Sequence, residues 1–215
     1  MRRRVNPDEA LSRERIADAA LAVLSEHGLD GLTVRKVAAR LGVQHGALYW
    51  HVRHKQDLLD EAAQALLMRE FAELSGPQTT DDWREWLAET ARRLRKAMLS
   101  HRDGAAIVAT SRSKSRVDMI SAIGEAVQQV LAEAGFSAEE AFAVQVGVLG
   151  YAMGVTAQEQ ATVERAMPPA NAERFPRLAR AKDAAAGILG EPDGPFEAGL
   201  AVLLDGAAQR RSKVK

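Results

Sequence analysis

The segment from Gly31 to Gln56 contains the side chains of this sequence that are best suited to contact a polyanion. It holds five lysines and arginines and three histidines, and it holds no aspartate or glutamate. The whole chain carries 29 basic and 29 acidic residues, so a stretch of this length would normally mix both signs. Cationic, amide, imidazole and aromatic side chains are those that contact the phosphates and base edges of DNA. The segment therefore predicts a nucleic-acid-binding surface.

Two short helices that meet at Gly42 would position these side chains. Thr33 can cap the first helix, which runs through Val37 and Leu41, and a glycine tolerates the left-handed backbone of the turn. A second helix follows from about Gln44 to His51. This is the helix-turn-helix pattern, whose second helix enters the major groove of DNA.

The apolar positions of these helices are spaced to form one inner face. We expect this face to contain Val37, Ala38, Leu41, Val43 and Leu48, packed against Ile16, Ala20 and Leu24 of the preceding helix. The outward face would carry Gln44, His45, Ala47, Tyr49, Trp50 and His51, and Lys55 would contact a backbone phosphate. Tyr49 and Trp50 could instead belong to the core. The histidines have no carboxylate or thiol neighbours, so we expect no metal there.

The composition of the chain favours an all-α, globular protein. Its 215 residues are 47% hydrophobic and 27% charged, and only 5% are aromatic. Alternating strand patterns are absent, while helix caps and stops are frequent. We expect nine or ten helices in two domains.

The same composition predicts a soluble, cytoplasmic protein. The chain has no cysteine, which excludes disulfides and thiolate metal sites and fits a reducing compartment. Its N-terminal stretch lacks the apolar core of a signal peptide. The longest apolar run, Ala141–Val155, is too short to span a bilayer, so we expect no membrane association.

Capping residues and glycines set the expected helix bounds. Besides the two short helices, they are Ser12–Gly28, Lys55–Leu74, Asp82–Ser100, Ala105–Thr110, Arg116–Ala134, Ser137–Glu164, Leu178–Leu189 and Pro195–Gln209. The segment "SGPQTT" after the fourth helix is the expected domain boundary. Residues 1–56 carry ten basic and six acidic residues, whereas residues 57–209 carry fifteen and twenty-three. This asymmetry fits a DNA-binding head at 1–56, a connecting helix at 55–74 and a body at 77–215.

"LTVRKVAARLGVQHGALYWHVRHKQDLLD" resembles the DNA-binding head of the tetracycline-repressor (TetR) family. The segments "MLSHRDGA" at Met98–Ala105 and "GFS" at Gly135–Ser137 are also similar to the family, although the likeness weakens beyond Ala105. The resemblance implies a homodimeric transcriptional repressor that binds a palindromic operator in double-stranded DNA. It also implies that residues 77–215 bind a small effector and form the dimer, and that the effector releases the protein from DNA.

Carried over by position, the resemblance assigns roles to the exposed face of the head. Arg35 matches a base-contacting arginine, and His45, Gly46 and Ala47 stand where tetracycline-sensing members of the family contact bases. These three residues differ from those members, so we expect a different operator sequence. The backbone-contacting or supporting positions are Thr33, Tyr49, Trp50, His51 and Lys55.

The effector site departs from the tetracycline-sensing pattern. In such members a histidine after "HRDGA" and a glutamate late in the long helix serve a magnesium ion, and here Val108 and Gln158 replace them. A valine cannot coordinate a metal, and an amide is a poor ligand for a hard dication. We therefore expect no metal or other cofactor and a flat, mostly apolar effector. The expected pocket residues are Phe71, Trp86, Thr90, Leu94, Val108, Ser111, Arg112, Met119 and Gln158.

The helices expected at Ser137–Glu164 and Pro195–Gln209 are rich in alanine, glycine, valine and leucine. Small residues allow close helix approach. We therefore expect these two helices to form a hairpin that pairs with the same hairpin of a second copy, which makes the four-helix bundle of a dimer.

Two other functions stay open at this point. The first is a helical small-molecule binding protein that no longer binds DNA, although Tyr49 and Lys55 argue against it. The second is an enzyme, but the sequence offers no nucleophile–base pair, no paired carboxylates and no metal cluster. The expected pocket residues could also be ordinary core residues around no ligand.

Overall fold

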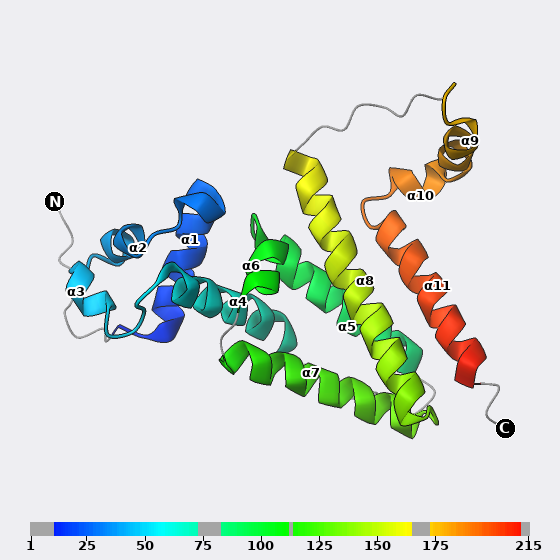
Figure 1. Ribbon diagram of the computed structural model, residues 1–215, viewed down its shortest axis with the longest axis horizontal. Coiled ribbons are helices and arrows are strands. Elements are labelled where there is room, and N and C mark those ends of the chain that lie inside the picture. The colour runs from blue at the N-terminus through cyan, green and yellow to red at the C-terminus, as the bar shows by residue number, and fades with distance from the viewer. Residues whose placement is uncertain (1–10, 73–82, 112–113, 165–172, 212–215) are drawn as a thin grey trace. The chain divides into compact units, whose positions relative to one another are not determined.

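The computed structural model describes residues 11–72, 83–111, 114–164 and 173–211, which form eleven α-helices and no strand (Figure 1). The helices are α1 Arg13–Gly31, α2 Val34–Leu41, α3 His45–Leu48, α4 Lys55–Phe71, α5 Trp83–Leu99, α6 Gly104–Thr110, α7 Lys114–Glu133, α8 Ala138–Glu164, α9 Pro176–Ala184, α10 Ala186–Gly190 and α11 Gly194–Arg211. The all-α prediction is confirmed. The helix expected at Leu178–Leu189 is two helices, because the backbone leaves helical geometry at Ala185.

The chain divides into two compact units. Unit 1 comprises residues 1–75 and 93–124, and unit 2 comprises residues 76–92 and 125–215. Residues 93–124 thus group with the head, although they lie within the region expected to form the body. The assignment of DNA binding to residues 1–56 and of effector binding and dimerisation to residues 77–215 stays a prediction.

In unit 1, α1 packs along α4 over a core of alanine, leucine and isoleucine side chains. The Ser12 hydroxyl accepts a hydrogen bond from the Arg15 N–H at 3.2 Å and begins α1 as expected. Gly28 does not end this helix. It kinks the helix by a left-handed backbone (φ 66°), and one further turn follows to Gly31. Arg13 pairs with Glu61 at 3.1 Å, which ties the start of α1 to α4.

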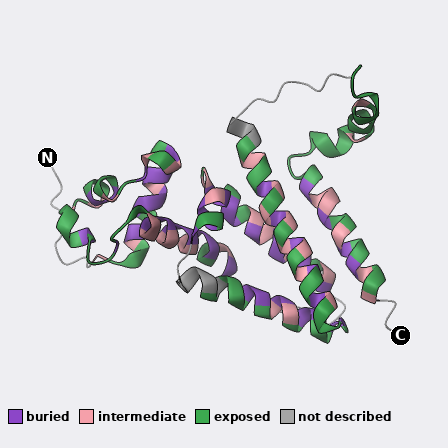
Figure 2. Cartoon of the chain, viewed as in Figure 1, coloured by how far each residue is buried: buried purple, intermediate pink, exposed green. Residues whose placement is uncertain are grey.

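The helix-turn-helix forms as predicted. The Thr33 hydroxyl accepts from the Lys36 N–H at 3.2 Å to cap α2, and Gly42 adopts the left-handed conformation (φ 69°) that ends it. The expected inner-face residues Val37, Ala38 and Leu48 are buried with Ile16, Ala20 and Leu24, whereas Leu41 and Val43 are half-buried (Figure 2). The second helix is shorter than predicted, because regular helix ends at Leu48 and Tyr49 begins a turn toward α4.

The "HRDG" turn between α5 and α6 is tightly constrained. A Cβ at Gly104 would lie 1.9 Å from the Met98 carbonyl oxygen, so only glycine fits there. Asp103 holds a left-handed backbone (φ 59°), and its carboxylate accepts from the Leu29 N–H at 3.0 Å. Burial lowers the pKa of His101, and the charge of Arg69 in the last turn of α4 adds to that effect. The turn therefore lies against the end of α1 and close to the end of α4.

In unit 2, α8 and α11 pack against each other as a hairpin. Ser137 and Glu140 form the predicted capping box of α8. The Ser137 N–H donates to the Glu140 carboxylate at 3.0 Å, and the Glu140 N–H donates to the Ser137 hydroxyl at 3.3 Å. The Tyr151 hydroxyl lies 3.0 Å from the Phe196 carbonyl oxygen, and a Cβ at Gly199 would lie 2.1 Å from that hydroxyl. A side chain at position 199 would therefore displace the Tyr151 ring from this contact.

Ion pairs join α5 to α11 within unit 2. The Arg92 guanidinium donates to both oxygens of Glu197 at 2.8 Å and 3.0 Å, and Arg84 pairs with Asp205. Hydrogen bonding to Glu197 is the main cause that raises the pKa of Arg92 above its ordinary value. The two pairs are eight residues apart on each helix, so they hold α5 and α11 antiparallel over two turns.

One stretch among the described residues, Ala138–Ala161 of α8, has the length and hydropathy of a membrane-spanning helix. This helix is longer than the apolar run Ala141–Val155 that the sequence marks out. The core helix of a soluble protein passes the same test, so the finding is weak evidence for a membrane span.

Candidate nucleic-acid interface and effector residues

All ten residues predicted to contact DNA are exposed in unit 1. They are Thr33, Arg35, Gln44, His45, Gly46, Ala47, Tyr49, Trp50, His51 and Lys55. They come from the start of α2, from α3 with the turn that follows it, and from the first residue of α4. The inner face of the same helices is buried. The fold therefore separates the apolar residues of the motif from those suited to contact DNA.

The two aromatic residues after α3 belong to this exposed face and not to the core. Trp50 is 91% exposed and Tyr49 is 45% exposed. The Tyr49 ring meets the His45 imidazole edge to face, with 4.8 Å between the ring centroids. An indole that is almost fully exposed loses the free energy of apolar burial, so its position favours a contact outside the subunit.

Most cations of this face are available to an anion. Among the described residues, Arg35, Lys36, Arg53 and Lys55 take part in no ion pair, whereas Arg40 pairs with Glu26 at 2.6 Å. Arg35 lies in the first turn of α2, and no acidic residue occupies that turn. The positive end of the helix dipole and the unpaired guanidinium both favour an anionic partner there.

The loop into α4 is fixed by a carboxylate. Asp57 accepts from the backbone N–H groups of Arg53 and His54 at 2.6 Å and 3.0 Å. These bonds close the loop that starts at Trp50 and fix the direction in which Lys55 leaves the start of α4. This role of Asp57 was not predicted from the sequence, although an acidic residue three positions after a cap is its usual signal.

The expected effector residues are distributed over both units. Phe71, Leu94, Val108 and Ser111 are buried residues of unit 1, while Trp86 and Thr90 are buried residues of unit 2. Gln158 belongs to unit 2 and is exposed. Arg112 and the side chain of Met119 lie outside the described residues. The Thr90 hydroxyl donates to the Trp86 carbonyl oxygen at 2.9 Å, so its hydrogen is already used within α5. The pocket that these residues would line stays a prediction.

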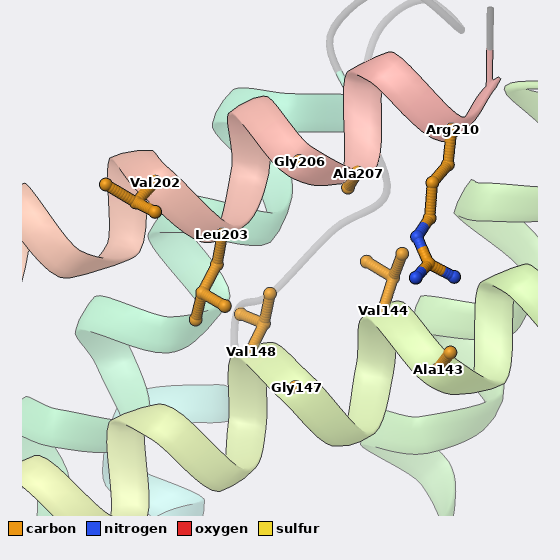
Figure 3. A pocket seen from close by; sticks show the side chains of 9 residues that line it. All are labelled: Ala143, Val144, Gly147, Val148, Val202, Leu203, Gly206, Ala207 and Arg210. Atoms are coloured by element: carbon orange, nitrogen blue, oxygen red, sulfur yellow. The ribbon is translucent and has the colours of Figure 1, made fainter.

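A groove of about 270 Å³ lies between α8 and α11 (Figure 3). Its lining is apolar or glycine except for one cation, and it consists of Ala143, Val144, Gly147, Val148, Val202, Leu203, Gly206, Ala207 and Arg210. The helices are those predicted to pair in a dimer, but the sequence pattern did not indicate the groove itself. The described residues include no group of three histidine, cysteine or acidic side chains placed to hold a metal ion.

Comparison with known protein families accounts for both parts of the chain. The model "Bacterial regulatory proteins, tetR family" matches residues 16–62, and "Tetracyclin repressor-like, C-terminal domain" matches residues 76–211. The chain belongs to the TetR family. It is therefore a DNA-binding transcriptional regulator that responds to a ligand.

Individual relatives agree with this family assignment. The chain is 44% identical over 203 residues to the tetracycline repressor protein class A from transposon 1721 of Escherichia coli, covering 92% of this chain and 90% of that protein. It is similar to the structure of the class A repressor in complex with 5a,6-anhydrotetracycline and magnesium, with a TM-score of 0.63 and 38% identity. The match covers 90% of this chain and 96% of that chain. It is also similar to the structure of BioQ with its double-stranded DNA operator, with a TM-score of 0.63 and 31% identity. The match covers 93% of this chain and 99% of that chain.

Proposed function

We propose that this TetR-family regulator is a cytoplasmic, homodimeric repressor that a small, mostly apolar effector releases from a palindromic operator. The observation that carries the proposal is the exposed, acid-free face of the helix-turn-helix, which presents unpaired cations and a 91% exposed tryptophan. A helical binding protein that no longer contacts DNA would gain nothing from keeping this face free of carboxylates. The roles of the individual residues are part of the proposal.

Base contacts and phosphate contacts come from different parts of the face. Arg35 contacts a base, best a guanine through its two-pronged guanidinium, and His45, Gly46 and Ala47 at the start of α3 contact neighbouring bases. Thr33, Tyr49, Trp50, His51 and Lys55 contact or support the phosphate backbone, and Gln44 lies at the N-cap of α3 beside them. Because the base-contacting residues of α3 differ from those of tetracycline-sensing members, the operator sequence differs as well.

Replacing Arg35 and Lys55 by alanine should separate these two roles. We expect Arg35→Ala to cost about 1–3 kcal/mol on the matched duplex and to relax specificity at one position per half-site. Lys55→Ala should weaken all sequences about equally, because a phosphate contact carries no sequence information. The measurement is the dissociation constant on a duplex selected from a random pool and on single-mismatch versions of it. Equal behaviour of the two variants on matched and mismatched duplexes would contradict the assignment.

A dimer through α8 and α11 accounts for the exposed apolar surface of unit 2. Phe142, Val146 and Val202 are 62%, 55% and 70% exposed on these helices. A Cβ at Gly147, Gly150, Gly154 or Gly206 would meet no atom within 4 Å, so nothing inside the subunit requires glycine there. These glycines and the groove of Figure 3 leave room for a helix of a second copy. A two-fold pairing of the hairpins would form a four-helix bundle and would match a palindromic operator.

Sedimentation should find a dimer at micromolar concentration, and Val146→Arg should shift it to the monomer. A guanidinium buried between two apolar hairpins would lose its hydration without a partner. Met68→Arg is the matched control, because Met68 is also exposed but lies on α4 of unit 1. A wild-type monomer at this concentration would overturn the dimer, and the palindromic operator with it.

The magnesium ion that tetracycline-sensing relatives use does not fit this chain. Val108, at the position of the metal-binding histidine, is 1% exposed and has no donor atom, and Gln158 offers an amide where a carboxylate is needed. We therefore assign no step to a metal. The remaining candidates, Phe71, Trp86 and Leu94, are apolar and suit a flat effector with few polar groups.

A further inference from the structure

One imidazole supplies the hydrogen-bonding capacity of the side chains of α3. Among the four residues of this helix, His45 to Leu48, only His45 has a side chain with a donor or an acceptor. A Cβ at Gly46 would meet no atom within 4 Å, so nothing inside the subunit requires a glycine there. The small residues Gly46 and Ala47 therefore leave His45 as the group of α3 that is able to distinguish bases by hydrogen bonding.

The His45 ring is held in place by a neighbouring ring and not by a hydrogen bond. Tyr49, four residues later, meets the imidazole edge to face, with 4.8 Å between the ring centroids and 87° between the ring planes. Among the described residues, no hydrogen bond or ion pair engages either ring nitrogen of His45. The side chain is exposed, so both nitrogens are available to a group outside the subunit.

The charged groups on the elements around α3 offer no counter-charge to a protonated His45. The basic groups are Arg35, Lys36 and Arg40 of α2, on which α3 packs, and His51, Arg53, His54 and Lys55 of the turn and the start of α4. The acidic groups of α1 and α4 are engaged elsewhere. Glu26 pairs with Arg40 at 2.6 Å, Glu61 pairs with Arg13, and Asp57 accepts from two backbone N–H groups. DNA, and not the subunit, would supply the negative charge that stabilises an imidazolium at this position.

We propose that His45 is the specificity-determining residue of α3 and that it binds a guanine as an imidazolium. This inference rests on the proposed function for the docking of α3 in the major groove. Guanine presents two acceptors there, N7 and O6, and no donor, whereas adenine and cytosine each present an amino donor. An imidazolium only donates, so it matches guanine and opposes an amino group. A neutral imidazole has one donor and one acceptor and accommodates either base.

Proton uptake gives this base preference a direction with pH. Histidine is the side chain that changes its charge between about pH 5 and 8. Guanine stabilises the charged ring in the complex, so the preference for guanine is largest at low pH and is lost as the pH rises. Protonation of His51 would also raise the affinity at low pH, but for all sequences alike, because its proposed contact is a phosphate. The affinity ratio of two duplexes that differ at one base pair cancels this shared effect.

The test is selection of bound half-sites from a random duplex pool by the full chain, at about pH 6 and at about pH 8. At the lower pH we expect the wild type to enrich guanine at one position of each half-site that depends on His45. Replacing that G·C pair by A·T in one half-site should then weaken binding by about fivefold or more, the lower end for a specific base contact. At the higher pH the same replacement should cost less than about twofold.

His45→Gln and His51→Gln separate base recognition from general attraction. An amide stays neutral and pairs with N6 and N7 of adenine, so His45→Gln should prefer A·T at that position, equally at both pH values. His51→Gln is the matched control, because His51 is also an exposed histidine of this face. It should weaken binding to all duplexes about equally and keep the pH-dependent preference for guanine.

The outcomes distinguish this inference from the proposed function. If the wild type binds no duplex more tightly than random DNA, the proposed function fails and the inference fails with it. If it binds a palindrome but its base preferences are the same at both pH values, or are unchanged in His45→Gln, the role of His45 is wrong and the DNA-binding function stands. Loss of the pH-dependent preference in His51→Gln as well would also overturn the role of His45. A guanine preference that weakens with rising pH, disappears in His45→Gln and persists in His51→Gln supports the inference.

Discussion

Raising the salt concentration from 50 to 200 mM is expected to weaken binding of the palindromic duplex by about 10³- to 10⁵-fold, if the two heads make about six to ten phosphate contacts. Each phosphate that a cation neutralises releases a counterion from the DNA, so the affinity falls as a power of the salt concentration. Lys36, Arg53 and Lys55 of each head are exposed, take part in no ion pair and are the proposed sources of this effect. Tyr49 and Thr33 are exposed as well, and their phosphate contacts would add affinity without releasing a counterion.

The measurement is the slope of log affinity against log salt concentration, for the palindrome and for one isolated half-site. Lys55→Ala should reduce the slope by about one per subunit, whereas Arg35→Ala should change it less. Val146→Arg should bind the palindrome no better than the half-site, because the two heads are then no longer linked. Equally tight binding to random duplex, or affinity that does not respond to salt in this range, would contradict the DNA-binding proposal.

The effector response should not depend on magnesium. We expect a planar, mostly apolar compound to weaken operator binding by about 5- to 150-fold, the usual range for coupled sites, with no added metal and in the presence of a chelator. Tetracycline with magnesium should leave operator binding unchanged, because Val108 and Gln158 cannot replace the metal ligands of tetracycline-sensing relatives. Release that requires magnesium and disappears with a chelator would show that this reading of Val108 and Gln158 is wrong.

Val108→Trp should give a repressor that still binds its operator but no longer responds to the compound. The indole would occupy the space proposed for the effector, while the DNA-contacting face of the head is unchanged. Ala109→Trp is the matched control, because Ala109 is the next residue of α6 and is exposed. Loss of operator binding in Val108→Trp alone would indicate overpacking of the unit 1 core, and a response equal to the wild type would place the pocket elsewhere.

Several features could be predicted from the sequence because they depend on neighbours within one helical turn. The Thr33 and Ser12 caps, the left-handed Gly42 and the capping box of Ser137 and Glu140 all form between residues no more than four positions apart. The apolar spacing likewise identified the buried face of α2 and α3. The exposed face, which we propose contacts DNA, then followed as the opposite side of the same two helices.

The exposure of Trp50 could not be predicted in this way. A tryptophan after a short helix suits either a core or a contact surface, and its spacing is compatible with both. The outcome depends on where α3 ends, and the regular helix stops at Leu48, earlier than the sequence pattern indicated. The following turn carries Trp50 outward, where it is 91% exposed.

The sequence by itself determined the all-α class, the helix-turn-helix and the residues of its outward face, because caps, glycines and helical periodicity act locally along the chain. Only the tertiary structure decided which distant segments meet. The Asp103 carboxylate on the Leu29 N–H and the Gln56 amide on the Thr110 carbonyl join residues 74 and 54 positions apart. No local pattern specifies such pairs, because each donor and acceptor could be satisfied equally well by water until the packing of the helices brings them together and excludes it.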